Sequence, residues 1–242
     1  MSRLHRPRAG FWIRLCVVVI YPFVGLIFRV RFRDLDRVTP PAEGGVIIAL
    51  NHVSHIDTLL MARMVWQSGR VPRFMVKSTL FARPGVGAIM RGAAQIPVYR
   101  GTADAAGSLR DAVRALRRGE AVVVYPEGTI TQDPRQWPMQ ARTGIARLAL
   151  LAPEIPVIPI GQWGAQRTRP RWRRYVTRPV ARVSVGKPVD LDRFRGAEAN
   201  AATLRDMTDT IMSAVRDEVA ALRGAQSPTE FFTPTRTYVD GR

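Results

Sequence analysis

The feature that most constrains the fold is a set of short, uninterrupted apolar runs separated by stretches with helical spacing. The runs at residues 46–50, 121–125 and 156–160 are too short for helices and lack polar alternation, which is typical of strands buried on both faces. Residues 105–118 repeat apolar side chains at helical spacing, and Gly119 follows as a stop signal. This alternation predicts α/β architecture: a single sandwich domain with a largely parallel sheet flanked by helices.

The remaining elements follow from the same criteria. Further strands are expected at 73–76, 94–98 and 180–185, and further helices at 57–66, 140–151 and 201–222. After Gly224 the chain is polar and rich in turn residues, so we expect a loosely packed tail. The predicted organisation is an N-terminal element at 1–33, the α/β domain at 34–224 and a polar tail at 225–242.

An apolar stretch near the N-terminus is bracketed by arginines. Residues 11–28 are apolar apart from Arg14. The uncharged run 15–28 would be about 21 Å long as a helix, against a hydrocarbon core of about 30 Å, and Pro22 would kink or break it. No small-residue cleavage site follows, which argues against a signal peptide. The pattern favours a helical element embedded in one leaflet, on the cytoplasmic face of the cell membrane. A buried core helix and a true span with Arg14 snorkelling stay open.

The net charge of +18 comes almost entirely from arginine. A strongly basic surface attracts anionic lipid, nucleic acid or anionic substrates. The segment 163–182 combines many arginines with Trp163, Trp172 and Tyr175, a composition found both at bilayer interfaces and in single-strand binders. We favour an anionic membrane surface as the partner and expect no nucleic acid. The single cysteine, Cys16, excludes an intrachain disulfide.

The first polar cluster follows the predicted strand at 46–50 and reads Asn51-His52-Val53-Ser54-His55-Ile56-Asp57. One interpretation is a helix capping box, with Ser54 as N-cap and Asp57 three residues later. The other is catalytic. His52 lies in an exposed strand-to-helix turn, where a neutral imidazole can act as general base while Asp57 holds its second ring nitrogen.

Two further clusters also follow predicted strands. The loop Tyr125-Pro126-Glu127-Gly128-Thr129 can present backbone N–H groups to an anion, or it can be an ordinary tight turn. Arg100 comes just after the strand at 94–98, where its guanidinium suits a phosphate, although it can equally be surface charge.

A fourth block is apolar: Ile155-Pro156-Val157-Ile158-Pro159. The four blocks and their order resemble the sequence pattern of the glycerolipid acyltransferase family, in particular of the bacterial lysophosphatidate acyltransferases. That family shows an Asn-His-x-Ser-x-x-Asp block, a later arginine, a Pro-Glu-Gly-Thr block and a Val-Pro-Val-Val-Pro-like block. The resemblance covers residues 46–160. It implies transfer of a fatty acyl group from acyl-CoA or acyl carrier protein to the free hydroxyl of lysophosphatidic acid, giving phosphatidic acid, with no cofactor and no metal.

The resemblance also assigns roles to residues. It makes His52 the catalytic base and Asp57 its partner. It places the following residues in or near the acceptor site: Arg100, Glu127, Gly128, Thr129, Lys77 and Arg142. The chain departs from the family at Ile130, where members commonly carry an arginine. Phosphate contact through that position is therefore lost or moved, and Arg142, Arg135 or Lys77 are the residues that can replace it.

Two alternatives remain at the level of the sequence. Within the acyltransferase interpretation, the acceptor can be glycerol 3-phosphate or another lyso-lipid. In a different class, the protein is a non-catalytic binder of anionic membrane lipid, which uses its basic surface while His52 and Asp57 merely cap a helix.

Overall fold

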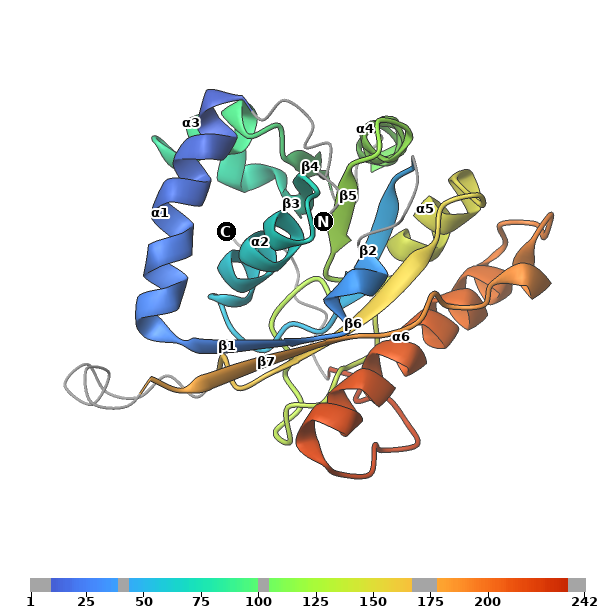
Figure 1. The fold of residues 1–242 in the computed structure, drawn as a ribbon. Coiled ribbons are helices and arrows are strands. Elements are labelled where there is room, and N and C mark those ends of the chain that lie inside the picture. The colour runs from blue at the N-terminus through green and yellow to red at the C-terminus, as the bar shows by residue number, and fades with distance from the viewer. Residues whose placement is uncertain (1–9, 39–43, 100–104, 167–177, 235–242) are drawn as a thin grey trace.

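A computed structural model describes residues 10–38, 44–99, 105–166 and 178–234, and its described part forms one sheet with helices on both faces (Figure 1). The strands are β1 (Arg29–Arg33), β2 (Val46–Leu50), β3 (Pro72–Lys77), β4 (Ile96–Val98), β5 (Ala121–Val124), β6 (Val157–Trp163) and β7 (Val180–Val185). Their order in the sheet is β1-β7-β6-β2-β5-β3-β4. The strands from β6 to β4 pair in parallel, whereas β7 pairs antiparallel with β6 and parallel with β1. The predicted α/β sandwich with a largely parallel sheet is confirmed.

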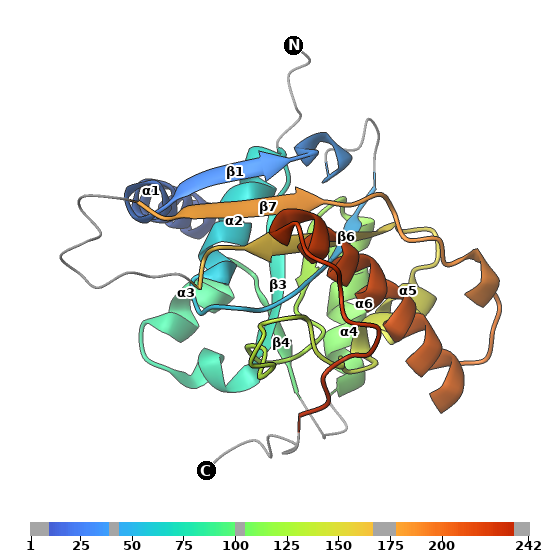
Figure 2. The same ribbon diagram turned by 90° about the horizontal axis from the view of Figure 1, so that it is seen from below.

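Helices cover the two faces of this sheet unequally. The helices are α1 (Phe11–Ile27), α2 (Asp57–Gln67), α3 (Val86–Gly92), α4 (Ala105–Arg117), α5 (Gly144–Leu151) and α6 (Ala201–Arg223), with short 3₁₀ turns η1 (Leu35–Val38), η2 (Ser78–Ala82) and η4 (Asp192–Phe194). Helices α1 and α2 lie side by side on one face, and α4, α5 and α6 cover the other (Figures 1 and 2).

The central strand β2 shows why the apolar runs lack alternation. Its residues are all buried, and successive side chains point to opposite faces. Ile47 and Ala49 join the core beneath α4, α5 and α6, whereas Ile48 and Leu50 join the core beneath α1 and α2. Because both faces are covered, a strand in this position needs apolar side chains throughout.

Helix α1 runs without interruption through Pro22, so the helix is not broken there. Pro22 lies on the exposed side of the helix, where the one backbone hydrogen bond it removes leaves no buried carbonyl behind. Val24 and Ile27 face inward and are buried. The outward face carries exposed apolar side chains at helical spacing: Phe11, Leu15, Val18, Val19, Phe23 and Leu26. Within the described residues, no helix has the length and apolarity needed to cross a membrane.

Residues 29–33, assigned above to the N-terminal element, form the edge strand β1. The strand pairs with β7 over its whole length, from Arg29 opposite Val180 to Arg33 opposite Ser184. Its arginines point outward, while Val30 and Phe32 are half-buried against the sheet. Arginines along an edge strand discourage pairing with another chain.

The segment after α6 is largely exposed, but Phe231 and Phe232 hold it against the domain. Phe231 lies 4.6 Å beneath the guanidinium of Arg216. The carbonyl of Phe232 accepts a hydrogen bond from the Gln140 N–H at 2.9 Å, beside a bridge between Phe232 and Met139. This contact holds residues 139–140 in extended form, which explains why α5 begins at Gly144 instead of the predicted residue 140. Residues 235–242 lie outside the described part.

Candidate active site

Two of the predicted polar clusters, residues 51–57 and 125–129, meet at the carboxyl ends of the parallel strands, which is where open α/β sheets bind ligands. Asn51 follows β2 and is locked to Gln162 of β6. The Asn51 side chain donates to the Gln162 carbonyl at 3.1 Å and accepts from the Gln162 N–H at 2.9 Å. The Gln162 amide returns a bond to the Asn51 carbonyl at 2.6 Å, and both residues are fully buried. This lock fixes the end of the strand from which His52 emerges.

His52 and Asp57 are in direct contact. His52 Nδ1 lies 3.0 Å from Asp57 Oδ2, and the same oxygen accepts the N–H groups of Val53 and Ser54 at 2.7 Å each. The His52 side chain is 17% exposed, whereas that of Asp57 is fully buried. Because an ionised carboxylate only accepts hydrogen bonds, the contact places the proton on Nδ1 and leaves Nε2 as the basic nitrogen.

The capping interpretation of Ser54 and Asp57 is partly wrong. Helix α2 begins at Asp57 and its N-cap is Ile56, not Ser54. Ser54 instead closes a tight turn just before the helix, in which its carbonyl accepts the Asp57 N–H and its hydroxyl accepts the Ile56 N–H at 3.3 Å. The Asp57 carboxylate does accept the Ser54 N–H, as in a capping box, but the same oxygen binds His52. Capping and orientation of the imidazole are thus compatible functions of one side chain.

Glu127 supports His52 from the β5 side of the site. Its Oε1 accepts the backbone N–H of His52 at 2.9 Å, and its Oε2 accepts the N–H of Met139 at 3.1 Å. Glu127 is 4% exposed. Burial raises the pKa of this carboxyl to about 8, even though the two backbone hydrogen bonds act in the opposite direction.

Tyr125 and Gly128 shape the loop after β5. The Tyr125 ring packs on the His52 ring, with centroids 4.3 Å apart and planes at 36°. Gly128 has a φ of +74°, which closes a tight turn, and its N–H donates to the Tyr125 carbonyl at 3.0 Å. That N–H is already engaged, so it is not a donor for an oxyanion. Burial, reinforced by the charge of Asp57, raises the pKa of Tyr125 well above its usual value.

A cavity of about 370 Å³ opens beside these residues. Tyr125, whose ring packs on His52, and Gly128 line it, and apolar side chains form most of the rest: Met75, Val98, Leu109, Val124 and Ile145. His52 and Asp57 are not among the residues that line this cavity. Arg142 and Arg147 also line it, and both are exposed. Among the described residues, neither arginine takes part in an ion pair. The cavity therefore combines an apolar wall with uncompensated positive charge.

The other predicted site residues are placed differently. Lys77 ends β3 and does not line this cavity. Thr129 is half-buried in the loop after Gly128. Arg135 is exposed and lies 3.8 Å from Asp133, away from the cavity lining. Of the three candidates to replace an arginine at position 130, the structure therefore brings only Arg142 to the cavity. Arg100 lies outside the described residues.

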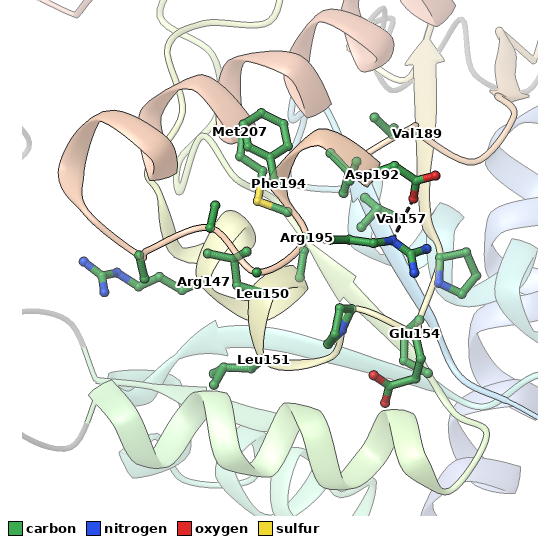
Figure 3. Close-up of a pocket in the computed structure, with 18 of the residues that line it drawn as sticks. Arg147, Leu150, Leu151, Glu154, Val157, Val189, Asp192, Phe194, Arg195 and Met207 are labelled. Carbon is green, nitrogen blue, oxygen red and sulfur yellow. Dashed lines mark hydrogen bonds and ion pairs between the residues drawn. The ribbon is translucent and has the colours of Figure 1, made fainter.

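A larger cavity of about 610 Å³ lies on the same face of the sheet (Figure 3), and Leu109 and Arg147 line both cavities. It is walled by Leu150, Val157, Phe194 and Met207, with the Asp192–Arg195 ion pair at its side. Val157 begins β6, whereas the polar clusters follow the other ends of the strands. Within the described residues, no group of three or more His, Cys, Asp or Glu side chains is placed to hold a metal ion.

Sequence comparison identifies relatives with stated activities. The chain is 23% identical over 196 residues to the chloroplastic 1-acyl-sn-glycerol-3-phosphate acyltransferase BAT2 of Brassica napus, covering 77% of this chain and 51% of the plant protein. It is 24% identical over 142 residues to the 1-acyl-sn-glycerol-3-phosphate acyltransferase of Bacillus subtilis, covering 57% of this chain and 66% of that protein. The chain thus spans about half the length of the plant relative.

A structure comparison shows the fold, and a family model shows the family. The crystal structure of the 1-acyl-sn-glycerophosphate acyltransferase PlsC from Thermotoga maritima superposes with a TM-score of 0.62 at 20% identity, covering 89% of this chain and 81% of that one, which shows a common fold. The model of the Acyltransferase family matches residues 29–163, more than half of the chain and including every polar cluster described above. The protein belongs to the Acyltransferase family.

Proposed function

We propose that the protein transfers a fatty acyl group from an acyl-CoA or acyl carrier protein thioester to the free hydroxyl of lysophosphatidic acid, giving phosphatidic acid. The observation that carries this proposal is the contact of His52 with Asp57, together with Tyr125, whose ring packs on His52 and also lines a cavity with an apolar wall and two arginines. Lysophosphatidic acid has matching chemistry, because it joins an acyl chain to a phosphate monoester. The names of the relatives in Brassica napus and Bacillus subtilis support the same acceptor.

In the proposed reaction His52 acts as a general base. Nε2 removes the proton from the acceptor hydroxyl as its oxygen attacks the thioester carbonyl, and the thiol of the donor leaves. Asp57 fixes the Nδ1–H tautomer and stabilises the imidazolium that forms. A general base contributes about 10²- to 10⁴-fold in rate, so juxtaposition of the two substrates supplies much of the remainder. Cys16 lies on α1, so it is not the acyl carrier in this scheme.

Arg142 is the proposed partner of the acceptor phosphate inside the cavity, with Arg147 as a second positive charge. The guanidinium binds phosphate oxygens in a bidentate manner, which an isoleucine at position 130 cannot do. The expected role of Arg100 in the same contact remains a prediction from the sequence.

We further propose that the protein works at the cytoplasmic face of the cell membrane, attached through α1. The outward face of α1 is apolar apart from Arg14, and arginines follow it in β1. A helix that lies at the level of the lipid headgroups matches this pattern, and each arginine near an anionic surface adds about 1 kcal/mol.

Mass spectrometry of the products tests the proposed activity. Purified protein is incubated with each of several acyl thioesters and a panel of lyso-lipids that includes glycerol 3-phosphate. Phosphatidic acid should form from lysophosphatidic acid, and the His52→Ala variant should not form it. Product from another acceptor only would reassign the substrate. Binding to anionic vesicles without any acyl transfer would favour the non-catalytic alternative.

A further inference from the structure

We propose that Glu127 is a positioning residue: it holds the backbone of His52 in place and does not contact the acceptor. This inference rests on the proposed function, because it assigns Glu127 a part in the work of the same base. It differs from the acceptor-binding role that the sequence resemblance implies for this residue.

The geometry of the Glu127 carboxyl group supports the inference first. Glu127 Oε1 binds the N–H of His52 at 2.9 Å and Oε2 binds the N–H of Met139 at 3.1 Å. Each oxygen therefore already has a backbone partner. With 4% exposure, the side chain also offers a substrate almost no accessible surface. An acceptor hydroxyl could reach a remaining lone pair of either oxygen only by entering the space around Glu127, which is almost closed to solvent.

The backbone of His52 is held on its other side as well. Its carbonyl accepts the N–H of Thr131 at 2.7 Å. Glu127 and Thr131 belong to the same loop after β5, so this loop clamps both backbone polar groups of His52. The side chain is then held by Asp57 at Nδ1 and packed by the Tyr125 ring. Removal of one clamp contact should let the imidazole shift, and displacement of a base by about 1 Å can reduce a rate by about 10²-fold.

Steady-state kinetics of Glu127→Gln distinguish a positioning residue from an acceptor ligand. The glutamine has nearly the same size but only one oxygen, so it can accept only one of the two N–H groups. We expect kcat to fall by about 10- to 100-fold while the KM for lysophosphatidic acid stays within about twofold of wild type. A large rise in acceptor KM with kcat retained would overturn the proposal.

Asp133→Asn is the matched control. Asp133 is also buried, and its two oxygens also accept backbone N–H groups, those of Arg135 at 2.9 Å and Trp137 at 3.2 Å, but it has no hydrogen bond to His52. The Asp133→Asn variant should have a lower melting temperature, much as Glu127→Gln does, but its kcat should stay within about threefold of wild type. An equal loss of kcat in both variants would show that loop stability alone matters.

An NMR titration of the imidazole separates failure of this proposal from failure of the proposed function. Histidine labelled with ¹⁵N is observed without any substrate, and the His52 signals are assigned with the His52→Ala variant. Glu127→Gln should shift the His52 ring signals, whereas Asp133→Asn should not. Unchanged ring signals in Glu127→Gln would contradict the positioning role even if no lyso-lipid proved to be a substrate. If Glu127→Gln does not fold, Glu127→Asp, which is too short to reach both N–H groups, is held to the same criteria.

Discussion

Asp57 contacts His52 through Nδ1 at 3.0 Å, so the imidazole nitrogen left for proton transfer is Nε2. The carboxylate is fully buried and its Oδ2 accepts three hydrogen bonds, two of them from the backbone of the same turn. The turn therefore holds Asp57, and Asp57 holds the ring.

The histidine pair gives the first prediction. His52→Ala should reduce acyl transfer by at least about 100-fold with an unchanged circular dichroism spectrum, because it removes the general base. His55→Ala should retain most activity, since His55 is exposed and, within the described residues, has no hydrogen bond to Asp57. Equal losses in the two variants, measured by thiol release from acyl-CoA, would remove His52 from its role.

A second prediction concerns the acceptor phosphate. Arg142→Ala should raise the KM for lysophosphatidic acid more than about tenfold and leave the donor KM nearly unchanged, because a charge-assisted contact is lost from the cavity. Arg135→Ala is the control, since Arg135 carries the same charge on the surface away from the cavity. An effect confined to the donor KM would instead assign Arg142 to phosphates of the donor.

The outward face of α1 leads to a third prediction. Val18→Glu with Leu26→Glu should weaken binding to anionic vesicles by about tenfold or more in cosedimentation, because both side chains are largely exposed and their loss removes apolar surface from the lipid contact. These substitutions spare the inward residue Val24, which a deletion of α1 would remove from the core. Leu151→Glu, at an exposed position on the opposite face of the sheet, should bind vesicles like wild type. Undiminished binding of the α1 variant would move the anchor elsewhere, with the segment 163–182 as the first candidate.

The raised pKa of Glu127 gives a fourth prediction. Its folded-state pKa of about 8 lies above its usual value of 4.5, so the folded protein holds this proton more tightly than the unfolded chain. The resulting stabilisation is fully present below pH 4.5 and is lost as the pH rises through about 8. In urea unfolding between pH 5 and 9, wild type should therefore lose stability relative to Glu127→Gln as the pH rises, by up to about 1.4 kcal/mol per pH unit. A difference in unfolding free energy between wild type and Glu127→Gln that did not change with pH would contradict this prediction.

A fifth prediction concerns the segment after α6. Ending the chain after Gly224 should lower the melting temperature by several degrees, since it removes the Phe231 contact with Arg216 and the Phe232 contact with residues 139–140. Acyl transfer should fall too, because the Met139 N–H is one partner of Glu127. Ending the chain after residue 234 retains both contacts and should leave melting temperature and activity near wild type. Equal behaviour of the two truncated chains would show that the packed segment contributes nothing.

Much of the sheet could be predicted because its strands are buried on both faces. Strand β2 has the predicted bounds, and β7 does as well. Strand β1 is not predicted from the sequence. Its alternating Arg and apolar residues are typical of an edge strand, but so many arginines beside an apolar stretch also suit contact with lipid headgroups. Helix α3 was also missed. It packs close to α1 at Gly92, where any side chain would overlap Trp12, and local spacing does not report such a contact.

The contact between His52 and Asp57 could be predicted from the sequence, whereas the residues that support it could not. His52 and Asp57 are five positions apart, so their contact is a property of one turn and its spacing is visible in the sequence. The partners that hold this turn lie far along the chain. Gln162 is 111 positions from Asn51, and Glu127 is 75 positions from His52. Their pairing depends on which strands are neighbours in the sheet, which the order of elements along the chain does not specify.

The pairing of β1 with β7 has a consequence for biosynthesis. Strand β1 pairs with no other strand in the described sheet, and its partner follows about 150 residues later in the chain. At about 5–20 residues per second, a ribosome needs roughly 8–30 s to add them. During that interval β1 has no partner strand, and both the unpaired strand and the apolar outward face of α1 beside it are open to aggregation. A chaperone or a lipid bilayer that covers α1 while the ribosome is still translating would raise the yield of folded protein.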